Sequence, residues 1–238
     1  MKCLVIIPAY NEQDNIVRVV ENLKSNYPQY DYVIINDGSA DSTPEICRMK
    51  GYELIDLPVN LGLAGAFQTG LKYAYQKNYD YAIQFDADGQ HLPQYIGTML
   101  EKMQEGYDIV IGSRFVTEKK PKSLRMLGNN MISFAMKLTT GYKVNDPTSG
   151  MRMFNKKMIA EFALNMNYGP EPDTVSYLLK QGATIAEVQV TMEERIAGTS
   201  YLTIGRSIMY MMHMMISILL IQNFRKRQKV KKIVVEEV

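Results

Sequence analysis

The sequence predicts an α/β protein built on a mostly parallel, Rossmann-like sheet with helices on both faces. Short apolar runs alternate with amphipathic segments from residue 3 to about residue 111. These runs are apolar throughout, as is typical of strands that are buried on both faces. The chain has 238 residues, of which 46% are hydrophobic and 22% charged, enough for one domain with a large core.

The expected elements follow one another in the order strand, helix, strand. Strands are expected at Cys3–Pro8, Tyr32–Ile35, Glu53–Leu57, Tyr81–Phe85, Ile109–Ile111 and Ile185–Met192. Helices are expected near 14–24, 42–50, 63–77, 93–105, 124–139, 155–165 and 171–181, with a turn-rich insert at 146–152. Since no linker or repeat divides the chain, we expect one domain over 1–205 and a C-terminal appendage over 206–238.

The composition excludes several classes of protein. The two cysteines, Cys3 and Cys47, are too few for a disulfide scaffold or a cysteine-based zinc site. The two histidines exclude a histidine-rich metal site, and no Gly-x4-Gly-Lys-Ser/Thr phosphate loop occurs. The apolar run before Pro8 is only five residues long, Cys3–Ile7, which does not match a secretory signal. We therefore expect the protein to act on the cytoplasmic side.

The charge is unevenly distributed along the chain. The formal net charge is +2, from 27 basic and 25 acidic residues, but residues 225–232 alone hold six of the basic ones. The rest of the chain carries 21 basic against 25 acidic residues, a net charge of −4. This mildly acidic body argues against a nucleic-acid-binding function. A basic tail beside an apolar helix fits an anionic membrane surface instead.

The C-terminal appendage is expected to form an amphipathic helix at a membrane interface. Residues 207–221 are a mostly apolar run with five methionines. As a helix this run is about 22 Å long, which is short of the ~30 Å hydrocarbon core of a bilayer. Its polar side chains form one narrow stripe at Arg206, Tyr210, His213 and Ser217. We expect this helix to hold the protein at the cytoplasmic face of the membrane, directly or through a small membrane subunit; a core helix is the alternative.

Three expected strand ends are unusually polar. They are followed by the segments Pro8–Glu12, Asn36–Ser39 and Asp86–Gln90. In parallel α/β sheets, functional loops lie beyond the carboxyl ends of the strands. Asp86 and Asp88 flank one residue, so their carboxylates can bind one hard cation and leave positions for phosphate oxygens, with Gln90 adding an oxygen. A solvated turn is the common alternative for such a triplet, and the apolar strand before it favours the metal site.

Seven short motifs occur in a recognisable order. They are Ile7–Glu12 (IPAYNE), Asn36–Thr43 (NDGSADST), Asn60–Gly62 (NLG), Asp86–His91 (DADGQH), Gly112–Phe115 (GSRF), Asp146–Arg152 (DPTSGMR) and Arg195–Ser200 (RIAGTS). Together they resemble family 2 glycosyltransferases, in particular the dolichol-phosphate mannose synthase-like branch of polyprenyl-phosphate sugar transferases. The resemblance covers about residues 1–205. It implies a GT-A fold, a nucleotide-sugar donor, Mg²⁺ or Mn²⁺, and inversion at the anomeric carbon.

The same resemblance implies roles for individual residues. The implied donor-binding positions are Pro8, Tyr10, Glu12, Ile35, Asp37, Asp86, Ala87, Gln90 and Arg195. Asp86, Asp88 and Gln90 resemble the metal-binding group. The expected catalytic residues are Asp88, through the metal that neutralises the leaving diphosphate, and Arg114 and Arg125, which would position the acceptor phosphate. Ser133 is a further candidate at that phosphate.

The expected activity is transfer of one sugar from a nucleotide sugar to undecaprenyl or dolichyl phosphate for cell-surface glycan assembly. A phosphate with a second pKa of about 6 is a competent nucleophile near neutral pH, so no strong base is required. An alternative acceptor, a saccharide hydroxyl, needs a base, for which Glu171 and Asp173 are candidates, although helix capping explains both equally well. Two departures from the family pattern, Asn36 and Tyr201, motivate another alternative, a catalytically silent sugar-nucleotide-binding partner of a membrane complex. Homo-oligomerisation is compatible with either activity.

Overall fold

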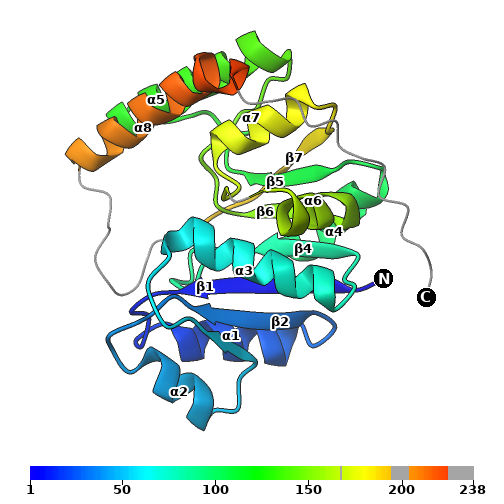
Figure 1. The fold of residues 1–238 in the computed structure, drawn as a ribbon, viewed down its shortest axis with the longest axis vertical. Helices are drawn as coiled ribbons and strands as arrows, with labels where there is room; N and C mark the ends of the chain where they lie inside the picture. Colours follow the sequence, from blue (N-terminus) through cyan, green and yellow to red (C-terminus); the bar gives the residue numbers. More distant parts are fainter. Residues whose placement is uncertain (167, 194–203, 225–238) are drawn as a thin grey trace.

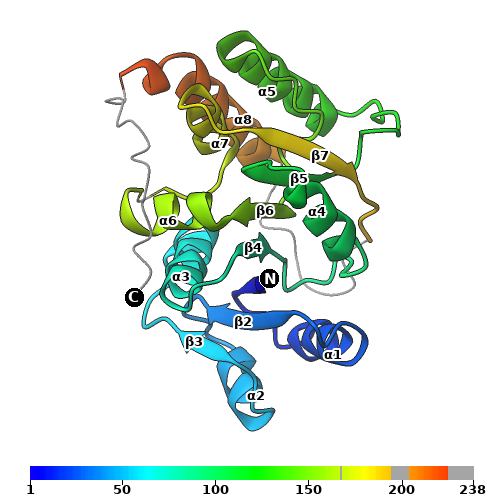
Figure 2. The same cartoon turned by 90° about the vertical axis from the view of Figure 1, so that its right-hand side faces the viewer.

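The computed structural model describes residues 1–166, 168–193 and 204–224, arranged around one sheet (Figure 1). The strands are β1 (Cys3–Ala9), β2 (Asp31–Asn36), β3 (Leu54–Asp56), β4 (Tyr81–Gln84), β5 (Ile109–Ser113), β6 (Arg152–Asn155) and β7 (Ile185–Gln189). Their order across the sheet is β3-β2-β1-β4-β6-β5-β7. Figure 2 labels all of them except β1, from β3 at the bottom to β7 at the top. Pairing is parallel except where β6 runs antiparallel to β4 and β5. The predicted mostly parallel sheet is confirmed.

Both faces of the central strands are buried, as their continuous apolar sequence predicts. All seven residues of β1 are buried. Because side chains alternate along a strand, Val5 packs in the core cluster on one face and Ile6 in the cluster on the other. Helices must therefore cover both faces.

Strand β6 was not predicted from the sequence. Residues 146–152 were expected to form a turn-rich insert that leads directly to a helix. Instead Arg152–Asn155 pairs with two strands at once, Met153 lying opposite Ile83 of β4 and Val110 of β5. Four residues give no readable periodicity, so this strand is specified by its long-range pairing.

Helices cover both faces of the sheet, as expected. The helices are α1 (Ile16–Asn26), α2 (Thr43–Met49), α3 (Gly62–Gln76), α4 (Tyr95–Gln104), α5 (Leu124–Thr140), α6 (Lys156–Leu164), α7 (Pro172–Lys180) and α8 (Ile204–Leu219), followed by a short 3₁₀ helix at Ile221–Asn223. The core on one face includes residues of α1, α2 and α4, and the core on the other includes residues of α3, α5, α6, α7 and α8. At the centre of the second core, the ring of Phe154 lies 6.0 Å from that of Phe67 and 5.2 Å from that of Phe162.

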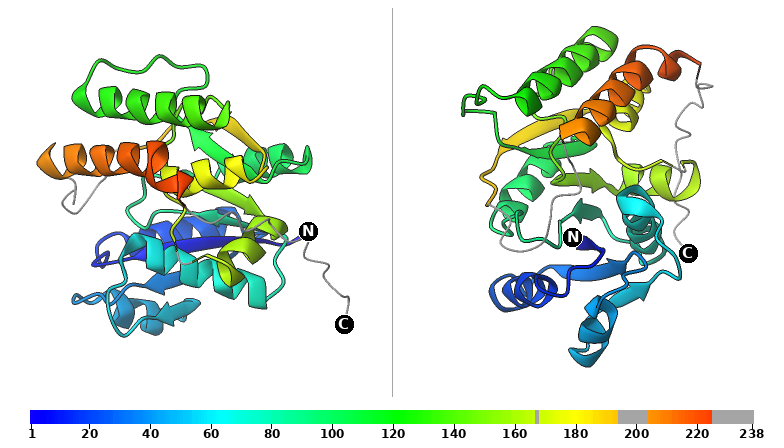
Figure 3. Two further views of the ribbon diagram at one scale, coloured as in Figure 1. Left: turned by 45° about the horizontal axis from the view of Figure 1, so that its top comes forward. Right: turned by 90° about the vertical axis from the view of Figure 1, so that its left-hand side faces the viewer.

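Helix α8 lies beside α5 and contacts α7 (Figures 1 and 3). Its inner side adds Met214 and Ile218 to the second core. A Cβ atom at Gly128 of α5 would lie 1.6 Å from the sulfur of Met211, so a larger residue at 128 would require Met211 to move. No helix within the described ranges is long and apolar enough to cross a bilayer. The boundary at 205 and the interfacial role of this helix stay predictions, and the basic tail at 225–232 lies outside the described residues.

Candidate functional site

The polar strand ends meet at one edge of the sheet. β1, β2 and β4 are parallel neighbours, so their carboxyl ends place Tyr10, Asp37 and Asp86 along the same edge. β5 has the same direction and adds Arg114. Because β6 is antiparallel, it begins at this edge, and the loop that precedes it reaches the same region. The topology therefore brings together motifs that are more than 130 residues apart in the sequence.

The loops after β1 and β2 are joined by hydrogen bonds. Asn11 N–H donates to the hydroxyl of Ser39 (2.9 Å), and the Asn11 side-chain oxygen accepts from the N–H of Ala40 (2.9 Å). Glu12 N–H donates to the hydroxyl of Thr43 (2.9 Å). Gly38 has φ +66°, and a Cβ there would lie 2.7 Å from the backbone nitrogen of Asn60, so only glycine fits. These contacts hold Tyr10, Glu12 and Asp37 on one rigid unit.

The Asp86–Asp88 turn presents two carboxylates of different exposure. The Asp86 side chain is 30% exposed, whereas Asp88 is only 4% exposed. One Asp88 carboxylate oxygen accepts the N–H of Gln90 (3.0 Å), and its backbone carbonyl accepts from the Arg18 guanidinium (3.2 Å). Gly89 has φ +82°, and a Cβ there would collide with Arg18. Arg18 thus holds the backbone of the turn in place, and the Asp86 carboxylate stays accessible.

These residues fit the implied divalent ion. Carboxylate oxygens are the ligands that Mg²⁺ and Mn²⁺ prefer. Within the described ranges, no group of three or more His, Cys, Asp and Glu residues could hold a metal by itself. Two carboxylates that leave positions for phosphate oxygens fit an ion bound together with a diphosphate. The Gln90 amide nitrogen donates to the carbonyl of Glu193 (3.3 Å), so its oxygen is the atom left for a metal.

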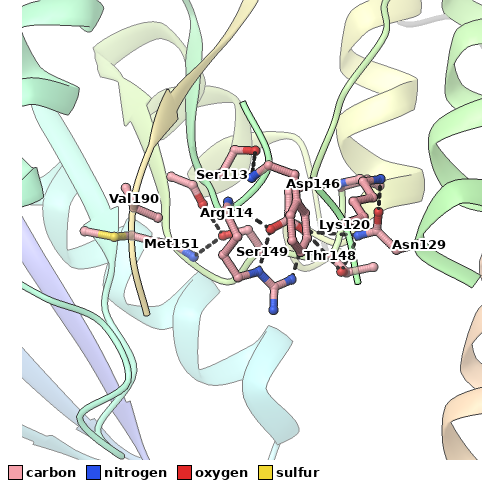
Figure 4. A network of polar contacts seen from close by, with 12 residues as sticks. Ser113, Arg114, Lys120, Asn129, Asp146, Thr148, Ser149, Met151 and Val190 are labelled. Atoms are coloured by element: carbon pink, nitrogen blue, oxygen red, sulfur yellow. Dashed lines mark hydrogen bonds and ion pairs between the residues drawn. The ribbon is translucent and has the colours of Figure 1, made fainter. Parts of the chain in front are cut away.

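Arg114 forms a bidentate ion pair with Asp146 (Figure 4). Its Nε and Nη2 donate to the two carboxylate oxygens at 2.7 and 2.9 Å. Asp146 has no exposed side-chain surface and also accepts from the amide of Asn129 (2.9 Å). Burial opposes ionisation, but hydrogen bonds and charge from Arg114 outweigh it and hold the pKa of Asp146 below its ordinary value. This pair fixes the arginine that was predicted to meet the acceptor phosphate.

Sequence reasoning missed Lys120 as part of this network. Its ammonium donates to the side-chain oxygens of Asn129 and Asn130. It also lies 5.6 Å from the ring centroid of Phe115, and the Arg114 guanidinium lies 5.1 Å from the same ring. Burial lowers the pKa of Lys120. The run of lysines at 119–122 was the only signal, and it could not show which lysine turns inward.

Several predicted donor-binding side chains are covered in the structure. Pro8, Asp37 and Ala87 are buried. The Asp37 carboxylate accepts the N–H of Leu61 (2.7 Å). Ile35 is fully buried in the second core, so the predicted donor contact does not fit its side chain and only its main chain is left for one.

The remaining predicted residues lie in three different settings. Arg125 is exposed on the first turn of α5. Ser133 donates its hydroxyl hydrogen to the carbonyl of Val144, which occupies it in a helix–loop contact. Arg195 lies outside the described residues. The roles of Arg125 and Arg195 stay predictions.

The two candidate bases serve as attachment points for α8. Asp173 is 7% exposed, and its carboxylate accepts the hydroxyl hydrogen of Ser217 (2.6 Å). Glu171 accepts from the hydroxyl of Tyr210, whose pKa is raised by burial and by that carboxylate. Both acids are therefore engaged in joining α7 to α8.

The sequence matches the model of the Glycosyl transferase family 2 over residues 4–162. A UDP-N-acetylglucosamine--dolichyl-phosphate N-acetylglucosaminyltransferase of Methanococcus voltae is 33% identical over 240 residues, covering 89% of this chain and 94% of that protein. An undecaprenyl-phosphate mannosyltransferase of Micrococcus luteus is 28% identical, covering 86% of this chain and 89% of that protein. A polyprenol monophosphomannose synthase of Mycolicibacterium smegmatis is 26% identical, covering 84% and 80%.

Solved structures share the fold. Glucosyl-3-phosphoglycerate synthase from Mycobacterium tuberculosis, in complex with Mn²⁺, uridine diphosphate and glucosyl-3-phosphoglycerate, superposes with a TM-score of 0.67. The similarity covers 92% of this chain and 80% of that chain at 18% sequence identity. At this identity the likeness concerns the fold, and it confirms the predicted GT-A architecture.

Proposed function

This chain belongs to glycosyl transferase family 2, and from that premise we propose that it transfers one hexose or N-acetylhexosamine from a nucleotide sugar to a polyprenyl phosphate. The relatives support this class of acceptor, because the names of two specify dolichyl and undecaprenyl phosphate and that of a third a polyprenol monophosphomannose product. Within the structure, the proposal is carried by one observation: an exposed apolar face includes the outer side of α5, and Asn129 on the inner side of the same helix contacts the network of Arg114 and Lys120.

Helices α5 and α8 form this apolar face. On α5 it consists of Leu124, Leu127, Met131, Phe134 and Leu138, and on α8 and the residue after it of Ile208, Met209, Met212, Ile216 and Leu220. All ten side chains are between 46% and 71% exposed. The α5 residues recur at intervals of three and four, which places them on one side of the helix. α5 and α8 are neighbours, and exposed apolar side chains gathered on neighbouring helices are typical of a membrane or partner contact.

Two polar side chains of helix α8 face the protein. Ser217 and Tyr210 donate to Asp173 and Glu171, and the amide of Gln222 donates to the carbonyl of Asp173. The inner side of α8 also packs Met214 and Ile218 into the core, and Met209, Met212 and Ile216 lie on its outer side. A water-soluble surface helix carries polar and charged residues on its outer side, so this apolar outer side favours an apolar environment outside α8.

The charge around the apolar face supports an anionic membrane as that environment. Residues 119–143 contain six basic and no acidic residues. The exposed ones among them are Lys119, Lys122, Arg125, Lys137 and Lys143. Each basic residue near an anionic lipid surface contributes about 1 kcal/mol of attraction. We propose attachment to the cytoplasmic face of the membrane, with residues 225–232 adding to it; a small membrane subunit is the alternative occupant.

One helix connects this face to the reaction site. Asn129 is fully buried on the inner side of α5, where it contacts Asp146 and Lys120. Leu127 and Met131 lie on the outer side of the same helix. Since α5 carries both, we propose that a lipid acceptor whose chain lies along the apolar face places its phosphate at the cationic network.

The proposed chemistry follows from these positions. Bound by Asp86, Asp88 and Gln90, a divalent ion would supply charge neutralisation for the departing nucleotide diphosphate. Arg114 uses Nε–H and one N–H of Nη2 for Asp146, so both N–H groups of Nη1 and the second of Nη2 are left for the acceptor phosphate. The acceptor phosphate attacks the anomeric carbon opposite the leaving group, which inverts its configuration.

The geometry gives less support to a saccharide hydroxyl as acceptor. Such an acceptor needs a general base, and the two candidates, Glu171 and Asp173, accept hydrogen bonds from α8. A silent sugar-nucleotide-binding protein is opposed by the accessible Asp86 carboxylate. Asn36, one of the departures that motivated this alternative, is explained by its neighbour. Its amide donates to the carboxylate of Asp56 (2.6 Å), which would repel a second carboxylate at position 36.

A panel assay tests the proposal. Purified full-length protein is incubated with Mg²⁺ or Mn²⁺, a set of UDP- and GDP-linked sugars, and undecaprenyl or dolichyl phosphate in detergent micelles. A lipid-linked monosaccharide from at least one donor is the expected product, and NMR of the new bond reports its configuration. Transfer to free saccharides but to no lipid phosphate would refute the proposed acceptor.

A further inference from the structure

The imidazole of His91 is buried directly behind the Asp86 carboxylate. His91 is 3% exposed, and its ring lies edge-on to that of Phe85, at 5.6 Å and 70°. Its Nδ1 accepts the backbone N–H of Asp86 at 2.9 Å. A cavity of about 110 Å³ that Arg18, Gly89 and His91 help to line lies at the back of this turn. His91 therefore contacts the turn from within the protein.

The hydrogen bond at Nδ1 determines where the imidazole proton is. A backbone N–H can only donate, so Nδ1 must accept and the ring proton is on Nε2. Nε2 lies 3.5 Å from Oδ2 of Asp86, and the amide of Gln84 lies 3.4 Å from Oδ1. Both carboxylate oxygens of Asp86 thus face an N–H donor from within the protein, at distances long enough to leave lone pairs for another ligand.

Gly150 closes this arrangement from the loop before β6. A Cβ at this position would lie 3.1 Å from Oδ2 of Asp86 and 3.3 Å from Cε1 of His91. The backbone of the loop therefore packs against the pair and restricts rotation of the carboxylate. This contact gives Gly150 a physical role that its place in a motif did not reveal.

From these contacts, and resting on the proposed use of a divalent ion, we propose that His91 is a positioning residue that orients the Asp86 carboxylate for metal binding. Nδ1 fixes the backbone of the turn, and Nε2–H fixes the rotation of the carboxylate. Groups that orient metal ligands in this way typically contribute 10- to 100-fold to metal affinity. The two nitrogens have separable effects, because different amides can replace each of them.

Two amide substitutions separate the contributions. In His91→Asn the side-chain oxygen can take the place of Nδ1, but nothing reaches Oδ2. In His91→Gln the amide nitrogen can take the place of Nε2. His213→Asn, at the exposed histidine of α8, is the matched control. Mn²⁺ affinity is measured by electron paramagnetic resonance with excess UDP and, separately, GDP, and thermal unfolding without metal reports the fold.

We expect His91→Asn to weaken Mn²⁺ binding at least tenfold, while His91→Gln and His213→Asn stay within about threefold of wild type. An unchanged affinity in His91→Asn, or equal losses in both His91 variants, would overturn the positioning role. If His91→Asn does not fold, a tenfold loss in folded His91→Gln overturns it as well. A wild-type protein that binds no Mn²⁺ with either nucleotide would instead refute the metal in the proposed function, and with it this role.

Discussion

Replacing Phe134 with serine is expected to weaken membrane binding without unfolding the protein. Phe134 is 66% exposed in the apolar face, so it contributes little to the core. Burial of a whole phenylalanine is worth about 1.5–3 kcal/mol, so transfer of the exposed two thirds into lipid is worth roughly 1–2 kcal/mol. Because about 1.4 kcal/mol corresponds to a factor of ten, the vesicle partition coefficient of F134S should fall roughly 5- to 30-fold.

Co-sedimentation with phosphatidylglycerol-containing vesicles measures this change. Met49→Ser is the matched control, since Met49 is 80% exposed at the end of α2, far from α5 and α8 in Figure 1. The chain contains no tryptophan, so Phe134→Trp provides a single indole as a second readout. Its emission should shift to the blue when vesicles are added, and that of Met49→Trp should not.

Equal vesicle binding by F134S and M49S would refute the assignment of this face to the membrane. An indole at 134 that keeps its emission maximum on vesicles that bind the protein would do the same. Slower sugar transfer to a lipid acceptor with unchanged vesicle binding would place Phe134 in acceptor recognition alone.

Three further predictions follow from the site and the core. Asp146→Asn should lower the free energy of unfolding by roughly 2–4 kcal/mol at pH 7 in urea denaturation, less than for a fully buried pair because Arg114 is 22% exposed. Since the folded pKa of Asp146 is lowered, its contribution to stability is fully present above the ordinary carboxyl pKa and is lost as pH falls through the folded value. The unfolding free energies of wild type and variant should therefore converge in acid, and a difference that is independent of pH contradicts the ion pair. Asp88→Ala should abolish sugar transfer, as should excess EDTA, while the loss of the hydrogen bond from Gln90 lowers stability by about 1 kcal/mol. Near-wild-type turnover by the folded variant rules out the metal role. Burial raises the pKa of the Cys3 and Cys47 thiols to about 12 and about 11, so iodoacetamide should label both only after denaturation, and rapid labelling of native protein would show that these sites open.

The sequence by itself determined the order of most elements and the edge of the sheet that carries the site. Apolar runs and helical periodicity are local properties, so the expected strands at 3–8, 32–35 and 81–85 correspond closely to β1, β2 and β4. The parallel arrangement then placed the polar segments after these strands at one edge. Seven ordered motifs led to the family, which the match over residues 4–162 confirmed.

Only the tertiary structure decided which polar groups meet. Arg114 and Asp146 are 32 positions apart and become neighbours because β6 is inserted antiparallel between β4 and β5. Four residues of β6 carry too little pattern to be recognised, so neither the strand nor the ion pair beside it could be predicted. The same applies to Lys120, one of several lysines in its loop.

The direction in which α8 faces was also decided by packing. Its polar stripe was visible in the sequence, but periodicity defines two sides of a helix without saying which one turns inward. Glu171 and Asp173, at the start of α7, accept hydrogen bonds from Tyr210 and Ser217, and these contacts turn the two side chains toward the protein, whereas His213 of the same stripe is exposed. Burying a polar group is favourable only where a partner accepts its hydrogen bond, so Tyr210 and Ser217 lie against the acids of α7. The side of α8 with Met209, Met212 and Ile216 is then left exposed, as is the apolar stripe of α5.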